Sequence, residues 1–337
     1  MDHYSALLDC IDRCMKRAPA QPMPFAFDGE GARHYGLLWP QGLWLCEDAQ
    51  QLALYRRVLD WENACADAQR AHSRTTSAIE AFSQNAGLSL LDDCPVLTDG
   101  VLLQIVSHRD LDREERARIA PLARRLRCTL TNRWPSICRC RPYRMHSAPD
   151  PDDLRLMHEG LQAAQRILSA PRRPDSLPVL DAQSGVRWEP LPPLAVPQFP
   201  RHTLRNELLR ERLKRLPVRS GAWEVTVQAL FNPSQAQDGG APVYHLMLIV
   251  VDEDSDAVLQ MSVSTLPGAD GAPELAEAFF EEAVQSGWLP EQLHCANPRT
   301  EALLSETLRA LPVAVDQRAS LPQLLAAYCS LLTVEQT

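Results

Sequence analysis

The sequence LMLIVV at Leu246–Val251 decides the fold of the C-terminal part of the chain. A short apolar run bounded by turn residues is typical of a buried strand, and the acidic turn Asp252–Asp256 follows this one directly. The run falls within a strand expected at Val243–Val251, and alternating patterns predict further strands at Trp223–Leu230 and Val258–Ser264. Because the connections are short, we expect these three strands to form an antiparallel meander.

The residues after the meander predict alternating helices and strands. Pro273 lies in the first turn of the first helix, and Gly287 lies just past its end. The expected elements are a helix at Pro273–Ser286, a strand at Gln292–Ala296, a helix at Pro298–Ala310, a strand at Pro312–Val315 and a helix at Leu321–Leu332. Residues 221–337 are therefore predicted to form an α/β domain of order βββαβαβα with one mixed sheet.

Residues 1–170 show an α+β pattern without a repeat. The expected elements are a helix at Tyr4–Lys16, a hairpin at Tyr35–Trp39 and Leu43–Cys46, a helix at Asp48–Phe82, a strand at Val101–Val106, and helices at Asp112–Leu126 and Pro151–Leu168. Eight prolines between Pro171 and Pro200 predict a linker without regular secondary structure. A charged amphipathic helix at His202–Leu216 should complete this linker region, residues 171–220.

Length and composition indicate a folded chain with two domains. The sequence has 337 residues, of which 45% are hydrophobic, and domains usually contain roughly 100–200 residues. No apolar run approaches the ~20 residues that span a bilayer, and the N-terminus lacks a signal or transit peptide pattern. The ten irregularly spaced cysteines fit reduced thiols. We expect a cytoplasmic protein without a cofactor and without a membrane partner.

Charge is distributed unevenly along the chain, whose net charge is −9. Residues 221–337 carry 16 acidic and three basic side chains, which leaves a net charge of +4 for residues 1–220. The most basic segment, Arg116–Arg144, contains nine arginines and no acidic residue. Arginine pairs with phosphate and stacks on bases, so this segment predicts binding of either nucleic acid or an acidic protein surface. The candidate binding residues are Arg116, Arg118, Arg124, Arg125, Arg127, Arg133, Trp134, Arg139, Arg141 and Arg144.

The C-terminal region resembles the ribonuclease H-like superfamily, and in particular the catalytic core of integrases and transposases. The resemblance is carried by Trp223–Val227, Leu248–Asp252 and Leu293–Asn297, in that order. In that superfamily, convergent carboxylates bind two divalent ions. Here Thr226 and Ala296 stand at the matching positions, and the last helix offers no acid. The resemblance therefore implies the fold without its metal site or its catalytic residues.

The whole chain also resembles a family of two-domain bacterial proteins that join such a domain to an α+β domain of unknown function. In the N-terminal part, this resemblance rests on Trp134–Pro135 and on Pro149 ahead of a helix at Asp152. The family implies no activity.

Two motifs have the residue types of metal sites without the usual spacing. The turn Asp252–Asp256 begins like an EF-hand loop, but Ala257 and Val263 occupy the positions of its glycine and its bidentate glutamate. Cys138 and Cys140, with Cys128 upstream and His146 downstream, form only one pair with a one-residue spacer. We therefore interpret the first as a solvated hairpin turn and the second as coincidence, and expect no metal.

These observations favour a non-enzymatic binding or scaffold protein with a catalytically inactive ribonuclease H-like domain. Two alternatives remain open. One is a nucleic-acid-binding protein that uses Arg116–Arg144. The other is a hydrolase or phosphotransferase with a site of unfamiliar pattern in the first domain or between the domains.

Overall fold

The computed structural model describes residues 3–29, 32–72, 94–107, 109, 111, 113, 116–117, 120, 134–171, 173, 175–181, 183–193, 198–230, 232–318 and 321–334. The chain divides into two compact units. Unit 1 comprises Met1–Arg57, Thr98–Pro142 and His146–Ala195. Unit 2 comprises Val58–Leu97, Tyr143–Met145 and Val196–Thr337.

Unit 1 is built on a seven-stranded mixed sheet of order β5-β4-β3-β2-β1-β6-β7. Its strands are β1 (Met23–Asp28), β2 (Arg33–Trp39), β3 (Gly42–Cys46), β4 (Gly100–Val106), β5 (Trp134–Cys140), β6 (Ser176–Asp181) and β7 (Gly185–Pro190). All neighbours are antiparallel except β1 and β6. The predicted hairpin is β2–β3, and the predicted strand at Val101–Val106 is β4.

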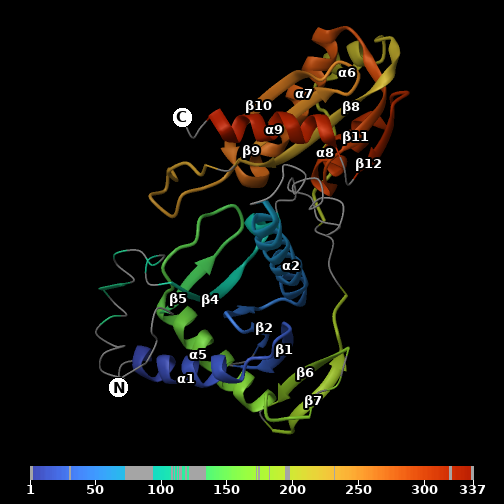
Figure 1. Ribbon diagram of the computed structural model, residues 1–337. Helices are drawn as coiled ribbons and strands as arrows, with labels where there is room; N and C mark the ends of the chain where they lie inside the picture. The colour runs from blue at the N-terminus through green and yellow to red at the C-terminus, as the bar shows by residue number, and fades with distance from the viewer. Residues whose placement is uncertain are drawn as a thin grey trace. The chain divides into compact units, whose positions relative to one another are not determined.

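Helices cover both faces of this sheet (Figure 1). The helices α1 (His3–Arg17) and α5 (Pro151–Ile167) pack on Leu43, Leu45 and Leu103. On the other face, Tyr55 of α2 (Ala49–His72) stacks on Trp44, with ring centroids 4.2 Å apart. A capping box between Asp150 and Asp153 starts α5 at Pro151. The expected helix at Asp112–Leu126 lies largely outside the described residues.

The prediction of a structureless linker is wrong for residues 176–190, because β6 and β7 complete the sheet of unit 1. The alternation of Leu177 and Val179, both buried, outweighs the proline count. Gly185, with φ 81°, closes the hairpin, and the Asp181 carboxylate accepts the backbone N–H groups of Gln183 and Ser184. The sequence itself contains these turn signals, Asp181 and Gly185.

The strand β5 was also missed, because its residues were interpreted only as part of a basic segment. It lies at the edge of the sheet, where Pro135 is tolerated because the missing N–H faces away from the ladder. This strand carries Cys138 and Cys140.

The sheet of unit 2 confirms the predicted meander with its two added strands. Its order is β10-β9-β8-β11-β12, formed by β8 (Val218–Ala229), β9 (His245–Asp252), β10 (Ala257–Pro267), β11 (Leu289–Cys295) and β12 (Ala314–Gln317). The first three strands are antiparallel, whereas β11 is parallel to β8 and β12 is parallel to β11. This arrangement is consistent with a ribonuclease H-like fold.

The two faces of this sheet are covered by different helices. Trp223, Val225 and Phe280 belong to the larger core, in which α6 (Glu207–Leu213), α7 (Ala272–Ser286) and α8 (Pro298–Leu308) pack on one face. On the opposite face, α9 (Pro322–Val334) packs through Leu324 and Tyr328. The predicted helix at His202–Leu216 is shortened to α6, which begins after the N-cap residue Asn206. None of the described helices is long and apolar enough to cross a membrane.

Candidate functional site

A neutral hydrogen-bond network occupies the region where the family resemblance places the first two metal-binding carboxylates. Thr226 is fully buried, and its hydroxyl accepts a hydrogen bond from the Asn297 side-chain amide at 3.3 Å. The Thr300 hydroxyl donates to Asn297 Oδ1 at 2.9 Å and accepts the Val227 N–H at 2.7 Å. Ala296, buried beside this network, packs in the apolar cluster under α9. These hydrogen-bonded side chains carry no formal charge.

Glu224 is a buried acid near this network that the sequence analysis did not single out. It lies two residues before Thr226 on β8, so both side chains share a face of the sheet. Its Oε2 accepts the N–H of Leu324 at 2.6 Å, at the start of α9. Burial raises the pKa of the Glu224 carboxyl above its usual value, although this N–H opposes the shift. The arrangement ties α9 to the sheet.

Glu224→Gln is expected to raise stability at neutral pH, whereas Glu224→Ala is expected to lower it by about 1–2 kcal/mol because the helix loses its acceptor. Because the folded protein raises the pKa of Glu224, the neutral carboxyl contributes stability that is fully present below pH 4.5, the usual pKa of the group. This stability is lost as the pH rises through the raised pKa. The advantage of Glu224→Gln should therefore grow with pH across that window. Urea denaturation of both proteins at several pH values measures the stability advantage of Glu224→Gln. An advantage that shrinks as the pH rises would contradict the raised pKa of Glu224.

Polar side chains also surround His294 on β11. This buried imidazole has Nδ1 3.0 Å from Glu253 Oε2, without the alignment of a hydrogen bond, and Nε2 3.7 Å from Asp316 Oδ1. Asp316 in turn pairs with Arg318 at 3.1 Å. Among the described residues, Glu224, Glu253 and Asp316 do not converge into a group that could hold one metal ion. Each of these acids has a different partner: Glu224 contacts the start of α9, Glu253 lies near His294, and Asp316 pairs with Arg318.

The acidic turn behaves as predicted for a solvated hairpin. Asp252 pairs with Ala257 at the ends of β9 and β10, and the Ser255 hydroxyl donates to the Asp252 carboxylate. Asp256 adopts a positive φ of 57°, which aspartate tolerates in tight turns.

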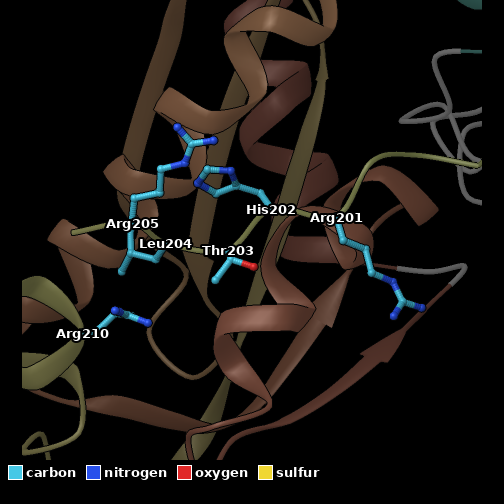
Figure 2. Close-up of a pocket in the computed structure, with 6 residues that line it drawn as sticks. All are labelled: Arg201, His202, Thr203, Leu204, Arg205 and Arg210. Carbon is cyan, nitrogen blue, oxygen red and sulfur yellow. The ribbon is translucent and has the colours of Figure 1, made fainter. Parts of the chain in front are cut away.

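A basic pocket lies in unit 2 (Figure 2). Its cavity has a volume of about 460 Å³ and is lined by Arg201, His202, Thr203, Leu204, Arg205 and Arg210. His202 and Arg205 lie side by side, whereas Arg201 extends in another direction (Figure 2). Among the described residues, two of the arginines have only long ion pairs: Arg201 with Glu306 at 4.0 Å and Arg210 with Glu207 at 3.5 Å.

His202 adds an unused polar atom to this pocket. Its Nε2 is buried and has no hydrogen-bond partner among the described residues. Burial lowers the pKa of His202, an effect that the positive charge of Arg205 reinforces and Glu277 opposes. The pocket therefore offers arginine side chains and a neutral imidazole, a set that suits an anionic ligand. The sequence analysis placed these residues in a linker and a helix and missed them as a site.

The structure only partly describes the predicted basic surface. Arg118, Arg124, Arg125, Arg127 and Arg133 lie outside the described residues. Arg116 and Arg141 are exposed, and Trp134 lies on β5. Arg139 pairs with Asp99 at 2.7 Å and with Asp153 at 3.3 Å, and Arg144 pairs with Asp238 at 2.9 Å. Two of the candidate arginines thus already bind carboxylates of the same chain.

Residues 209–332 match the family model of a domain of unknown function (DUF6930). No curated protein matches the sequence. Among solved structures, the chain is similar to one chain of the cryo-electron microscopy structure of a simian T-cell lymphotropic virus intasome in complex with the PP2A regulatory subunit B56 gamma. The identity is 13%, the similarity covers 36% of this chain and 36% of that chain, and the TM-score is 0.22.

Proposed function

We propose that the chain is a non-enzymatic binding protein whose C-terminal domain is a ribonuclease H-like scaffold without a metal centre. The single observation that carries this proposal is the neutral network of Thr226, Asn297 and Thr300. A two-ion site needs several anionic ligands, because Mg²⁺ gives up its water reluctantly and is normally held with carboxylate help. A threonine and an alanine at the two matching positions supply none.

The binding role is assigned to the basic pocket around Arg205. Its volume, about 460 Å³, lies within the range of small-ligand pockets, roughly 300–1,000 Å³. Arg205 and Arg210 provide donors that suit phosphate oxygens, and His202 Nε2 donates as well in the tautomer that carries its proton there. We therefore assign a phosphate-bearing ligand to this pocket.

Pyrophosphate is expected to bind the full chain in calorimetric titrations at low salt, and Arg205→Ala is expected to weaken binding about 10-fold, since one charge-assisted hydrogen bond contributes about 1.5 kcal/mol or more. The matched control is Arg318→Ala, because Arg318 is a partly exposed arginine of the same unit that pairs with Asp316, and neither of these two residues lines the pocket. Its affinity should equal that of the wild type. Equal loss in both variants, or no binding at low salt, would refute the pocket as the ligand site.

Nucleic-acid binding through Arg116–Arg144 stays a prediction for the arginines outside the described residues. Within the described part, the ion pairs of Arg139 and Arg144 favour the alternative in which this segment binds acidic protein groups.

A further inference from the structure

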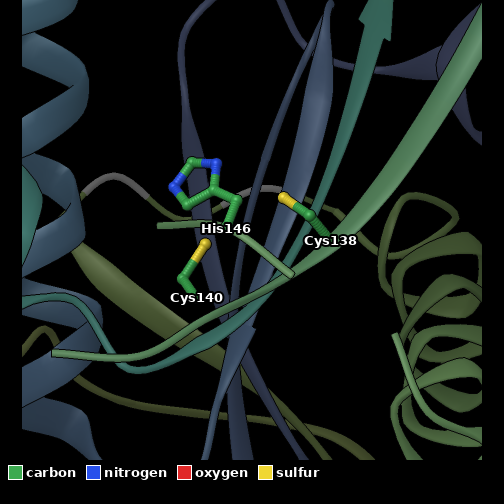
Figure 3. A group of neighbouring side chains, drawn as sticks. All are labelled: Cys138, Cys140 and His146. Carbon is green, nitrogen blue, oxygen red and sulfur yellow. The ribbon is translucent and has the colours of Figure 1, made fainter. Parts of the chain in front are cut away.

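Three side chains of the types that bind metal ions come together in unit 1, although the sequence analysis interpreted their proximity along the chain as a coincidence. The ligand atoms of Cys138, Cys140 and His146 all lie within 4.8 Å of one another. Both sulfur atoms point toward the His146 ring (Figure 3). No other group of three such ligands occurs among the described residues.

Local backbone geometry explains this convergence. Cys138 and Cys140 lie two residues apart on β5, so their side chains share one face of the strand. Arg139 between them pairs with Ser147 in an antiparallel bridge, with N···O distances of 2.9 and 3.0 Å. This register places His146 opposite Cys140. Arg139 has its own partners, Asp99 and Asp153, which hold the strand in place.

The spacing and the surroundings fit a thiophilic cation. In tetrahedral zinc sites, ligand atoms at 2.0–2.3 Å from the metal are separated by about 3.5–3.8 Å, so small side-chain rotations from the observed arrangement suffice. Two thiolates neutralise a divalent ion, which suits a partly buried site. Cys140 is buried, Cys138 is half-buried and His146 is exposed, so a cation can enter from solvent.

We propose that Cys138, Cys140 and His146 bind one Zn²⁺ ion through two sulfur atoms and one imidazole nitrogen, with a fourth position open to water or a partner ligand. A one-residue spacer departs from the usual pattern because both cysteines come from one strand rather than from a turn. The site is separate from the basic pocket and does not depend on the proposed function.

The test uses the full chain, stripped of metal under reducing conditions and titrated with Co²⁺ as a spectroscopic probe and with Zn²⁺ in competition. We expect one Co²⁺ per chain with a thiolate-to-cobalt charge-transfer band that Zn²⁺ removes. Cys138→Ser and His146→Ala should each weaken binding about 100-fold or more, since loss of a direct ligand exceeds the effect of changes around the ligands. His146 is exposed, so His146→Ala should leave the fold intact.

The matched control is Cys46→Ser, because Cys46 is a buried cysteine of the same sheet whose thiol donates to the Asp48 carbonyl. Its Co²⁺ spectrum should equal that of the wild type. The proposal is overturned if the reduced wild type shows no thiolate-to-cobalt band. It is equally overturned if Cys138→Ser and His146→Ala bind as well as Cys46→Ser does.

Discussion

Thr226→Asp is expected to destabilise the protein by about 3–5 kcal/mol at pH 8, because it buries a carboxylate without a positively charged partner. Thr226 is fully buried, and its neighbour Asn297 can offer a single amide donor. Burial should raise the pKa of the new carboxyl, so the cost should be smaller at pH 5, where the acid is largely protonated. Urea denaturation at both pH values measures the effect.

The matched control is Thr226→Asn, which has nearly the same size and stays neutral, and should cost about 1 kcal/mol. Mg²⁺ distinguishes the two interpretations of this position. If the domain retained a latent metal site, Thr226→Asp would supply a ligand, and Mg²⁺ would restore stability through binding to the native state. We expect no restoration. Recovery in Mg²⁺ would show that the remaining ligands are in place.

Trp223→Ala is expected to cost about 3–5 kcal/mol, the usual loss for a large aromatic side chain removed from a core. Trp223 is fully buried on β8 and makes edge contacts with Phe279 and Trp288, with ring centroids 6.1 and 5.0 Å apart. These contacts join the sheet of unit 2 to α7 and to the residues just before β11. Apolar packing around Trp223 is therefore expected to contribute much of the stability of unit 2.

Hydrogen exchange of the β9 amides should report this loss as reduced protection, because β9 pairs directly with β8. Trp188→Ala provides the comparison, since Trp188 is half-buried on β7 in unit 1 and makes a cation–π contact with Arg173. Trp188→Ala should lower the free energy of unfolding by only about 1 kcal/mol, and the protection of the β9 amides should not change. Equal loss of β9 protection in both variants would contradict separate cores for the two units.

The fold of unit 2 could be predicted from its sequence because local signals agree with one another. The apolar strand β9, the acidic turn and the glycine at the end of α7 each specify one arrangement. In unit 1, the signals conflict. Proline density concealed the hairpin of β6 and β7, and arginine content concealed β5. The strands β5 and β7 are the edges of this sheet, where prolines and charged residues are tolerated, whereas β6 lies between β1 and β7.

The absence of the carboxylates that the family resemblance calls for could be predicted from two positions, Thr226 and Ala296. The polar contacts found near these positions could not be predicted. Glu224 contacts Leu324 one hundred residues away, so no local pattern indicates it. His146 meets Cys140 only because Arg139 pairs with Ser147, a register that the spacing of the cysteines does not encode. The basic pocket draws its residues from a short segment rich in arginine, and that composition was the one available signal.

The central claim, a ribonuclease H-like domain without metal-dependent chemistry, is tested most directly by a cleavage assay. The purified full chain is incubated with labelled single strands, duplexes and RNA–DNA hybrids in Mg²⁺ or Mn²⁺, with EDTA as the control. We expect no EDTA-sensitive cleavage, because Thr226 and Ala296 supply no anionic ligand. EDTA-sensitive cleavage that co-purifies with the protein and is lost in Glu224→Gln or Asp316→Asn would contradict the claim.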